Sequence, residues 1–352
     1  MPFRMKKILS YLIKGLYSLA LKVKNIPAVK AALYAARNKN LFSNVDQHER
    51  MLADAVRVDN YHAAIHKYVQ EGDTVVDLGS GTGILSFFAS QKKPKHIYAI
   101  DHGAIIDMAK FLAAKNNVHN ISFVQTHSSK FLPSELVDVI IHEQIGDFLV
   151  DEDMVRNLCD LRDRILKPGG KILPNEFDLF MEPVQIEKGM RTPFLWEQQL
   201  HGVRFDGTKV WLNSEQNTIS KAQRHHRLQP NQVSHFLCEP EPVFTFDILS
   251  VDPNNMPTKF IASKKVVYPG IMDGFCLYFN IRFDEEIVIP TSPMAKPTHW
   301  ANQLFRTDPI ECQAGDIIEL ELEMPSYTSV AGWKVKHNIK KGLLENVALQ
   351  PV

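Results

Sequence analysis

The pattern of apolar and polar positions changes near residue 176. From residue 73 to 173, short apolar stretches alternate with longer stretches of helical periodicity, which is typical of a parallel sheet joined by helices. The helical stretches are Ala104–Lys115 and Met154–Leu166, and Lys167-Pro168-Gly169-Gly170 predicts a turn into the last strand. The predicted strands are Thr74–Leu78, His96–Ile100, Ile121–Val124, Asp138–His142 and Lys171–Pro174.

Beyond residue 176 the pattern favours strands with little helix between them. It predicts an antiparallel β-domain or barrel. Residues 203–229 are polar and weakly patterned, so they form either an arm or a long loop. We therefore divide the chain into residues 1–41, 42–176 and 177–352. The predicted strands of the last part are Val243–Ile248, Lys264–Val267, Phe275–Phe283, Glu286–Ile289 and Ile317–Glu323.

The N-terminal segment is basic and amphipathic. Residues 1–40 contain nine Lys or Arg and no Asp or Glu, whereas the remainder holds 31 basic and 40 acidic residues. Residues 5–24 place apolar side chains on one face of a helix, and Lys14 interrupts the apolar run that a signal peptide would need. Two interpretations stay open: the helix contacts an anionic membrane or a partner's groove, or it packs on its own protein.

The composition is that of a globular protein with a sizeable core. Of 352 residues, 45% are hydrophobic and 23% are charged, and 40 basic residues balance 40 acidic ones. This balance argues against specific nucleic-acid binding by the whole chain. The cysteines lack any CxxC or metal-ligand spacing, so we expect free thiols, a reducing cytoplasmic location and no metal. They are Cys159, Cys238, Cys276 and Cys312.

A glycine-rich loop follows the first predicted strand. Asp77-Leu78-Gly79-Ser80-Gly81-Thr82-Gly83 has the spacing DxGxGxG, in which glycines let the chain turn from strand to helix close to a ligand. The spacing differs from the GxGxxG of NAD-binding proteins and suits S-adenosylmethionine, which has no pyrophosphate. Asp101 ends the second strand, where its carboxylate can accept hydrogen bonds from ribose hydroxyls. The alternative is a tight turn in some other α/β fold.

Two glutamates flank a hairpin after the fourth strand. Glu143 lies at the carboxyl end of the sheet, where α/β enzymes bind ligands, and Glu152 lies at the start of the next helix. Two carboxylates on one hairpin can hold a planar guanidinium from two edges. Taken alone, the acids Asp151, Glu152 and Asp153 are better explained by the dipole of that helix.

Three segments carry a resemblance to the protein arginine methyltransferases. The segment from Glu143 to Met154 is similar to the family's double-glutamate loop, and Pro297-Thr298-His299-Trp300 resembles its Thr-His-Trp loop. His48-Glu49-Arg50-Met51-Leu52-Ala53-Asp54-Ala55-Val56-Arg57 resembles the helix that precedes its sheet. These motifs occur in the family's order between about residues 42 and 324.

The resemblance implies a fold and a set of roles. The fold would be a Rossmann-like, seven-stranded methyltransferase sheet followed by an antiparallel β-barrel-like domain, with a homodimerisation arm at residues 203–229. Glu143 and Glu152 would hold the substrate guanidinium, and His299 with Asp54 would take its proton. The residues predicted to hold S-adenosylmethionine are His48, Met51, Arg57, Asp77, Gly79, Gly81, Asp101 and Ser129.

The chain also departs from the family pattern. Gln144, Ile145 and Asp147 replace Trp-Met and Tyr in the glutamate loop, so the wall around the substrate is more polar. Asp147 either attracts a more cationic substrate or faces water. Ser128-Ser129 stands where an acid usually contacts adenine, and His142 replaces a serine.

Three functions follow from these observations. The first is N-methylation of a guanidine group in protein arginine or a small guanidino compound. The second is methylation of another acceptor, an oxygen or an amine, by the same architecture. The third is a catalytically silent scaffold that binds the cofactor or a partner.

Overall fold

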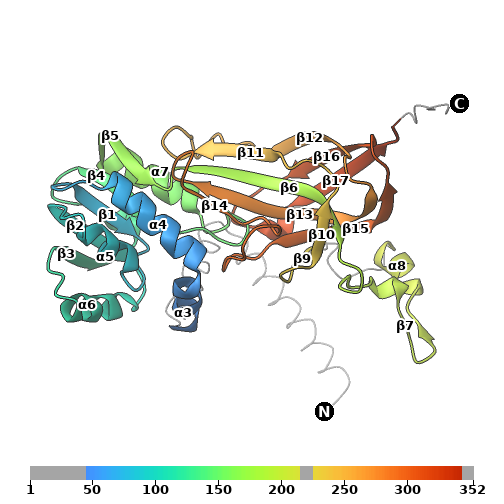
Figure 1. Cartoon of the computed structure of the whole chain (residues 1–352), viewed down its shortest axis with the longest axis horizontal. Coiled ribbons are helices and arrows are strands. Elements are labelled where there is room, and N and C mark those ends of the chain that lie inside the picture. Colours follow the sequence, from blue (N-terminus) through green and yellow to red (C-terminus); the bar gives the residue numbers. More distant parts are fainter. Residues whose placement is uncertain (1–44, 215–224, 343–352) are drawn as a thin grey trace, which may run out of the picture.

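The computed structural model describes residues 45–214 and 225–342. The predicted helix at residues 5–24 lies outside this range. Figure 1 shows two lobes side by side, a parallel sheet with its helices and an elongated antiparallel β-domain. No helix within the described ranges is long and apolar enough to cross a membrane. All four cysteines are buried and carry free thiols.

The first lobe is a parallel sheet with strand order β3-β2-β1-β4-β5. Its strands are rich in β-branched residues, and every residue of β1 is buried. Helix α5 packs on β1 and β2, α6 on β3 and α7 on β5. The elements are β1 (Thr74–Leu78), α5 (Ile84–Ser90), β2 (His96–Asp101), α6 (Ile106–Lys115), β3 (Ile121–Gln125), η1 (Ser128–Lys130), β4 (Val137–His142), α7 (Met154–Ile165) and β5 (Leu166–Leu173).

The predicted count of seven strands in this sheet is wrong: the described residues contribute five. After β5 the chain enters β6 (Glu176–Ile186), which pairs with strands of the second lobe and adds nothing to the first. The predicted turn at residues 167–170 lies within β5. It forms a bulge there, because Leu166 pairs with Val137 and Lys171 already pairs with Val139.

The second lobe is antiparallel, as predicted, but its described strands do not close into one barrel. They form one seven-stranded sheet around β6 and β13 and a separate sheet in the order β12-β16-β17. The main hydrophobic core runs through both lobes. The strands are β9 (His225–Arg227), β10 (Val233–Phe236), β11 (Pro242–Asp247), β12 (Lys259–Lys265), β13 (Gly270–Arg282), β14 (Val288–Pro290), β15 (Gln303–Cys312), β16 (Ile317–Glu323) and β17 (Lys334–Lys340), with η3 (Val330–Gly332) before the last.

Two helices precede the parallel sheet where the sequence predicted one. Helix α3 (Val45–Ala53) ends and α4 (Ala55–Tyr68) begins at Asp54, whose side chain caps α4 by accepting a hydrogen bond from the Arg57 backbone N–H. Tyr61 and Ile65 bury the inner face of α4. The break therefore brings Asp54 to a helix N-terminus instead of a helix interior.

An arm projects from the far end of the second lobe (Figure 1). It comprises η2 (Leu195–Glu197), the short strands β7 (Gln199–Leu200) and β8 (Val203–Arg204), and α8 (Gly207–Leu212). The arm was predicted at residues 203–229, but it begins about eight residues earlier, at Leu195. Its residues 215–224 lie outside the described range.

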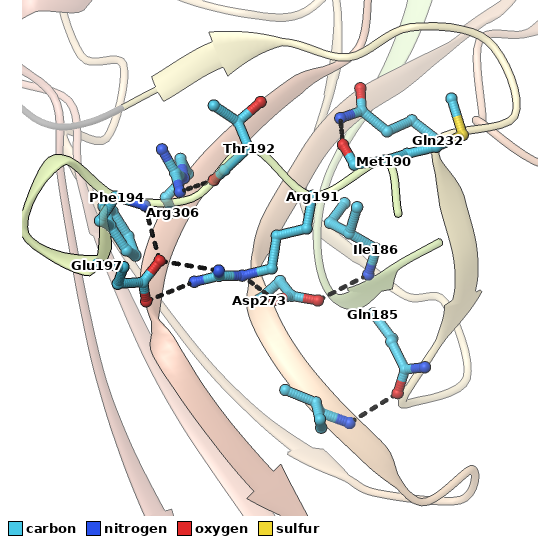
Figure 2. Close-up of polar contacts among 11 residues, drawn as sticks. Gln185, Ile186, Met190, Arg191, Thr192, Phe194, Glu197, Gln232, Asp273 and Arg306 are labelled. Carbon is cyan, nitrogen blue, oxygen red and sulfur yellow. Dashed lines mark hydrogen bonds and ion pairs between the residues drawn. The ribbon is translucent and has the colours of Figure 1, made fainter. Parts of the chain in front are cut away.

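The base of the arm is held by a polar cluster (Figure 2). The Arg191 guanidinium forms two ion-pair contacts with Glu197, at 2.9 and 3.0 Å, and a third with the buried Asp273 at 2.9 Å. The Arg306 guanidinium lies 3.7 Å from the centre of the buried Phe194 ring. This cluster joins the arm to β13 and β15.

Candidate active site

The glycine loop lies at the carboxyl edge of the parallel sheet, where the strand order reverses. Leu78 pairs with His142, so Gly79 and Glu143 leave adjacent ends of β1 and β4. Gly81 has a positive φ of 51°, and a Cβ there would lie 2.9 Å from His48 Cε1. Glycine is therefore required both for the turn and for the close approach of α3. In open α/β sheets this crevice is the ligand site.

Asp101 supports the loop from the end of β2. One oxygen of its carboxylate accepts from the Gly81 N–H at 2.9 Å and the other accepts from the Gly103 N–H at 2.6 Å. A carboxylate has about four acceptor positions, so two remain for a ribose diol. Two buried polar atoms nearby, Ser80 Oγ and His102 Nε2, have no hydrogen-bond partner among the described residues. Sequence reasoning missed both, although Ser80 lies between two of the glycines and His102 follows Asp101.

Asp77, which was predicted to contact the cofactor, is a buried residue at the base of the loop. Its side chain is fully buried under the loop, where one oxygen accepts from the backbone N–H and the hydroxyl of Ser86, at 3.0 and 2.6 Å. Burial raises the pKa of Asp77 to about 7, although the Ser86 hydrogen bonds lower it. Asp77 therefore holds strand β1 to helix α5 through one oxygen, while its other oxygen is buried without a hydrogen-bond partner among the described residues.

Arg57 connects the two halves of the predicted site. Its guanidinium is buried, pairs with Glu143 Oε2 at 3.0 Å and donates to the Met51 carbonyl at 2.8 Å. The third nitrogen of the guanidinium, Nε, is buried and has no hydrogen-bond partner among the described residues. An unused donor on a buried cation fits a carboxylate ligand, as predicted for the cofactor's amino-acid end. The contact between Arg57 and Glu143 was not predicted.

The hairpin between the two glutamates is sharply bent. Gly146 and Leu149 form its bridge, and Asp151 packs against Gly146 so closely that a Cβ there would collide with its carboxylate. Leu149 and Asp153 adopt positive φ of 70° and 57° without being glycines. Such conformations persist where surrounding structure enforces them, often at functional sites.

Both glutamates remain inside the site. The Glu143 side chain is 12% exposed, and Glu152 is partly buried. Burial raises the pKa of Glu152 well above its ordinary value, and the negative charge of Glu143 raises it further. The two acids are thus close enough to repel each other, and a cation between them would favour the ionised form of both.

His299 and Asp54 are in contact across the two lobes. Both the backbone N–H and Nδ1 of His299 lie 2.8 Å from Asp54 Oδ2. Burial alone would raise the pKa of Asp54, but hydrogen bonds from His299 and Arg57 lower it below its ordinary value. With Nδ1–H donated to this carboxylate, Nε2 of the neutral ring is left as the proton acceptor.

Asp147 is partly buried and is bonded to the loop that carries His299. Its carboxylate accepts from the Ala301 N–H at 2.9 Å, and the Trp300 indole donates to the Ile145 carbonyl at 2.7 Å. Two hydrogen bonds therefore join the glutamate hairpin to the loop that carries His299. Sequence reasoning could not find them, because the partners are 154 and 155 residues apart.

The remaining predicted positions divide between the site and its surroundings. Ser129 is exposed, and its backbone and hydroxyl contact the ring of His127. His142 is buried and donates through Nε2 to the Pro174 carbonyl, and burial lowers its pKa to about 4, so the ring is neutral. The hydroxyl of Tyr61, which was not predicted, donates to the His142 carbonyl at 2.9 Å.

Comparison with family models gives two matches. Residues 194–331 match the arginine methyltransferase oligomerization subdomain. Residues 62–174 match the ribosomal protein L11 methyltransferase (PrmA) model. The two matches divide the chain between the parallel lobe and the β-domain with its arm.

Solved structures share the fold. The Trypanosoma brucei PRMT1 enzyme-prozyme heterotetrameric complex with AdoHcy superposes with a TM-score of 0.73 at 21% identity, covering 86% of this chain and 96% of that one. Arabidopsis thaliana protein arginine methyltransferase 10 gives a TM-score of 0.67 at 24% identity, covering 85% and 98%.

Sequence relatives agree with these matches. Protein arginine N-methyltransferase 1 of Dictyostelium discoideum is 29% identical over 286 residues, covering 79% of this chain and 81% of that protein. Protein arginine N-methyltransferase 6 of Xenopus tropicalis is 31% identical over 284 residues, covering 76% and 79%. With this identity over most of both chains, the protein belongs to the protein arginine N-methyltransferase family.

Proposed function

We propose that the protein transfers a methyl group from S-adenosylmethionine to a guanidine nitrogen of arginine in a polypeptide. The observation that supports this most directly is the pair Glu143 and Glu152, held inward on one hairpin, with Arg57 and its unused Nε donor beside them. S-adenosylmethionine, when bound, supplies an electrophilic methyl group. Arg57 would hold its carboxylate, and Asp101 would accept from its ribose.

The protein's own residues would prepare the guanidinium. Glu143 and Glu152 would accept hydrogen bonds from its planar edges, neutralise its charge and fix one terminal nitrogen in place. A guanidinium is protonated in solution, so a proton must leave the nitrogen that gains the methyl group. His299 Nε2 would take it, and Asp54 would stabilise the imidazolium that results.

The test is a comparison of Glu152→Gln with Asp153→Asn. Glutamine keeps the size of Glu152 but removes the charge that balances a guanidinium, so activity on arginine peptides should fall roughly a hundredfold or more. Asp153 is the adjacent acid, 40% exposed, and asparagine tolerates its positive φ, so the same loss of charge should leave activity within about threefold.

Wild-type protein and both variants are incubated with S-adenosylmethionine and either arginine peptides or free guanidino compounds. Mass spectrometry then reports the addition of a methyl group. If only guanidino compounds gain one, the polypeptide substrate is wrong. If neither gains one although calorimetry shows that S-adenosylmethionine binds, methylation of guanidines is wrong and the scaffold alternative gains support.

We also infer that the protein forms a homodimer through the arm. Leu200, Val203, Val210 and Trp211 of the arm are exposed apolar residues. The arm begins where the match to the oligomerization subdomain begins, at residue 194. Exposed apolar residues gathered on one projection are typical of a protein interface.

A further inference from the structure

Helix α4 is tied to the β-domain at both ends. At its start, the N-cap Asp54 accepts both hydrogen bonds from His299. At its end, Lys67 Nζ and the Tyr68 hydroxyl donate to the same oxygen of Asp284, at 2.8 and 2.5 Å. With 14 residues the helix is about 21 Å long, so ties at its two ends fix both its position and its tilt.

Asp284 is itself held rigidly in the turn between β13 and β14. Its other oxygen accepts from the backbone N–H groups of Glu286 and Ile287, both at 2.7 Å. The preceding Phe283 is buried and meets the Tyr61 ring of α4 edge to face, with centroids 5.0 Å apart. The turn therefore offers α4 a preorganised acceptor, because no further ordering of Asp284 is needed to make the contact.

The position of α4 affects the candidate site because the first turn of this helix carries Arg57. Arg57 reaches Glu143 at 3.0 Å, and its second terminal nitrogen is already bound to the Met51 carbonyl. A guanidinium held at two points cannot follow a tilt of the helix without losing a contact. Displacements of about 1 Å at such a site are enough to reduce catalysis greatly.

We propose that Asp284 is a positioning residue for methyl transfer: it holds the C-terminal end of α4 and thereby sets where Arg57 meets Glu143 and the cofactor's carboxylate. The inference rests on the proposed function for the role of Arg57. It adds a second tie, about four helical turns from Asp54 and His299, that none of the predicted site residues supplies.

The structure provides a matched control in Glu286. Its carboxylate contacts the same Lys67 Nζ, at 3.0 Å, but its side chain is 83% exposed. Asp284 is 18% exposed and also receives the Tyr68 hydroxyl. Exposed ion pairs contribute little, so Glu286→Gln should leave α4 in place.

The experiment uses the full chain at a temperature where circular dichroism shows every variant folded. In Asp284→Asn, the new amide NH₂ faces either the two donors of α4 or the backbone N–H groups of its own turn, so one set of contacts is lost. Calorimetry measures the affinity for S-adenosylhomocysteine, and kinetics measure KM for S-adenosylmethionine and kcat on an arginine peptide. We expect affinity and kcat/KM to fall about tenfold in Asp284→Asn and to stay within about twofold in Glu286→Gln. Tyr68→Phe, which removes one hydroxyl, should give an intermediate loss and replaces Asp284→Asn if that variant does not fold.

A double-mutant cycle separates positioning from a general loss of stability. If Asp284 acts through Arg57, Asp284→Asn should have almost no further effect in an Arg57→Lys background. If the losses of affinity in the two single variants multiply in the double variant, the proposal is wrong. It is also wrong if Asp284→Asn leaves the affinity unchanged while Arg57→Lys weakens it. Either result leaves the cofactor role of Arg57 intact. Unchanged affinity in Arg57→Lys would overturn both the proposal and the cofactor role given to Arg57.

Discussion

At the scale of single residues, the pKa values of carboxylates removed from water differ in direction within the site. Asp54 is buried but receives hydrogen bonds from His299 and Arg57, and its pKa is lowered. Asp77 is buried and Glu152 is partly buried, each with fewer donors, and their pKa values are raised. The difference follows from hydrogen bonding to the charged form, which opposes the loss of hydration. A raised pKa means that the ionised carboxylate is disfavoured where it lies, and a cation bound beside it would stabilise that form. A cation can reach the partly exposed Glu152 but not the fully buried Asp77.

The raised pKa of Asp77 predicts how stability depends on pH. Because its folded pKa of about 7 exceeds the ordinary 3.8, the folded protein binds the extra proton, and the stability gained at low pH is lost as pH rises through 7. Asp77→Asn removes this charge and can still accept from Ser86. Its free energy of unfolding relative to wild type should therefore rise between pH 5 and pH 8, by roughly 3 kcal/mol at most. Urea denaturation at both pH values measures it.

The matched control for this prediction is Asp107→Asn, which removes an acid of α6 that is 70% exposed. Its effect on the free energy of unfolding should be nearly the same at both pH values, because an exposed carboxylate keeps its hydration when the protein folds. A difference between Asp77→Asn and wild type that does not change with pH would show that Asp77 is ionised in the folded protein at low cost.

At the scale of elements, the strands that the sequence predicted well have a simple local pattern: Thr74–Leu78 is mostly apolar, and Ile317–Glu323 alternates between apolar and acidic residues after Ile317. Thr74–Leu78 and Ile317–Glu323 match β1 and β16 residue for residue. Strand β6 was missed, although it lies at the centre of the second lobe, because Asp178 and Glu182 interrupt its pattern. Both are buried there because Asp178 accepts from Thr245 and Glu182 pairs with the buried Lys264 at 2.8 Å. A charged residue can lie in the core when it pairs with a residue of another strand. The pattern of one strand does not show that partner, so it cannot predict such a buried charge.

The candidate site divides in the same way. The glycine loop and the glutamates follow from local motifs at strand ends, and the structure brings these motifs to one edge of the sheet. The contact of Arg57 with Glu143 and the cap of Asp147 on Ala301 join segments whose separation in sequence exceeds 80 residues. Asp147 in particular was expected to meet solvent or substrate, because its side chain looked unpaired in the hairpin alone.

The cap at Asp147 predicts a distinction between two substitutions. Asp147→Asn keeps an oxygen that can accept from the Ala301 N–H, whereas Asp147→Ala leaves that N–H without its partner and loosens the His299 loop. We expect kcat on an arginine peptide to fall about tenfold in the alanine variant and less than threefold in the asparagine variant. If asparagine is as harmful as alanine, the charge of Asp147 acts on the substrate, and the positioning role is wrong.

At the scale of the whole molecule, exposed apolar side chains occur on the arm, on the parallel lobe and on the β-domain. Val210 of the arm is 75% exposed, and Phe111 and Leu132 of the parallel lobe are 61% and 76% exposed. The Arg191 and Arg306 contacts hold the arm away from its own parallel lobe (Figures 1 and 2). An arm fixed in that direction keeps its apolar residues away from the described parallel lobe, so a second copy is the surface that we propose for them.

The oligomeric state should therefore depend on the arm and not on exposed apolar area in general. Val210→Asp should convert the dimer to a monomer at micromolar concentration in multi-angle light scattering, because burying an unpaired carboxylate in each half of the interface costs several kcal/mol. Ile261→Asp is the matched control: Ile261 is a β-branched residue that is also 75% exposed, but it lies on β12. Its variant should remain dimeric, because the Lys and Glu side chains around β16 and β17 already make that face suited to water. A wild-type monomer, or dissociation caused equally by both substitutions, would contradict the assignment of the interface to the arm.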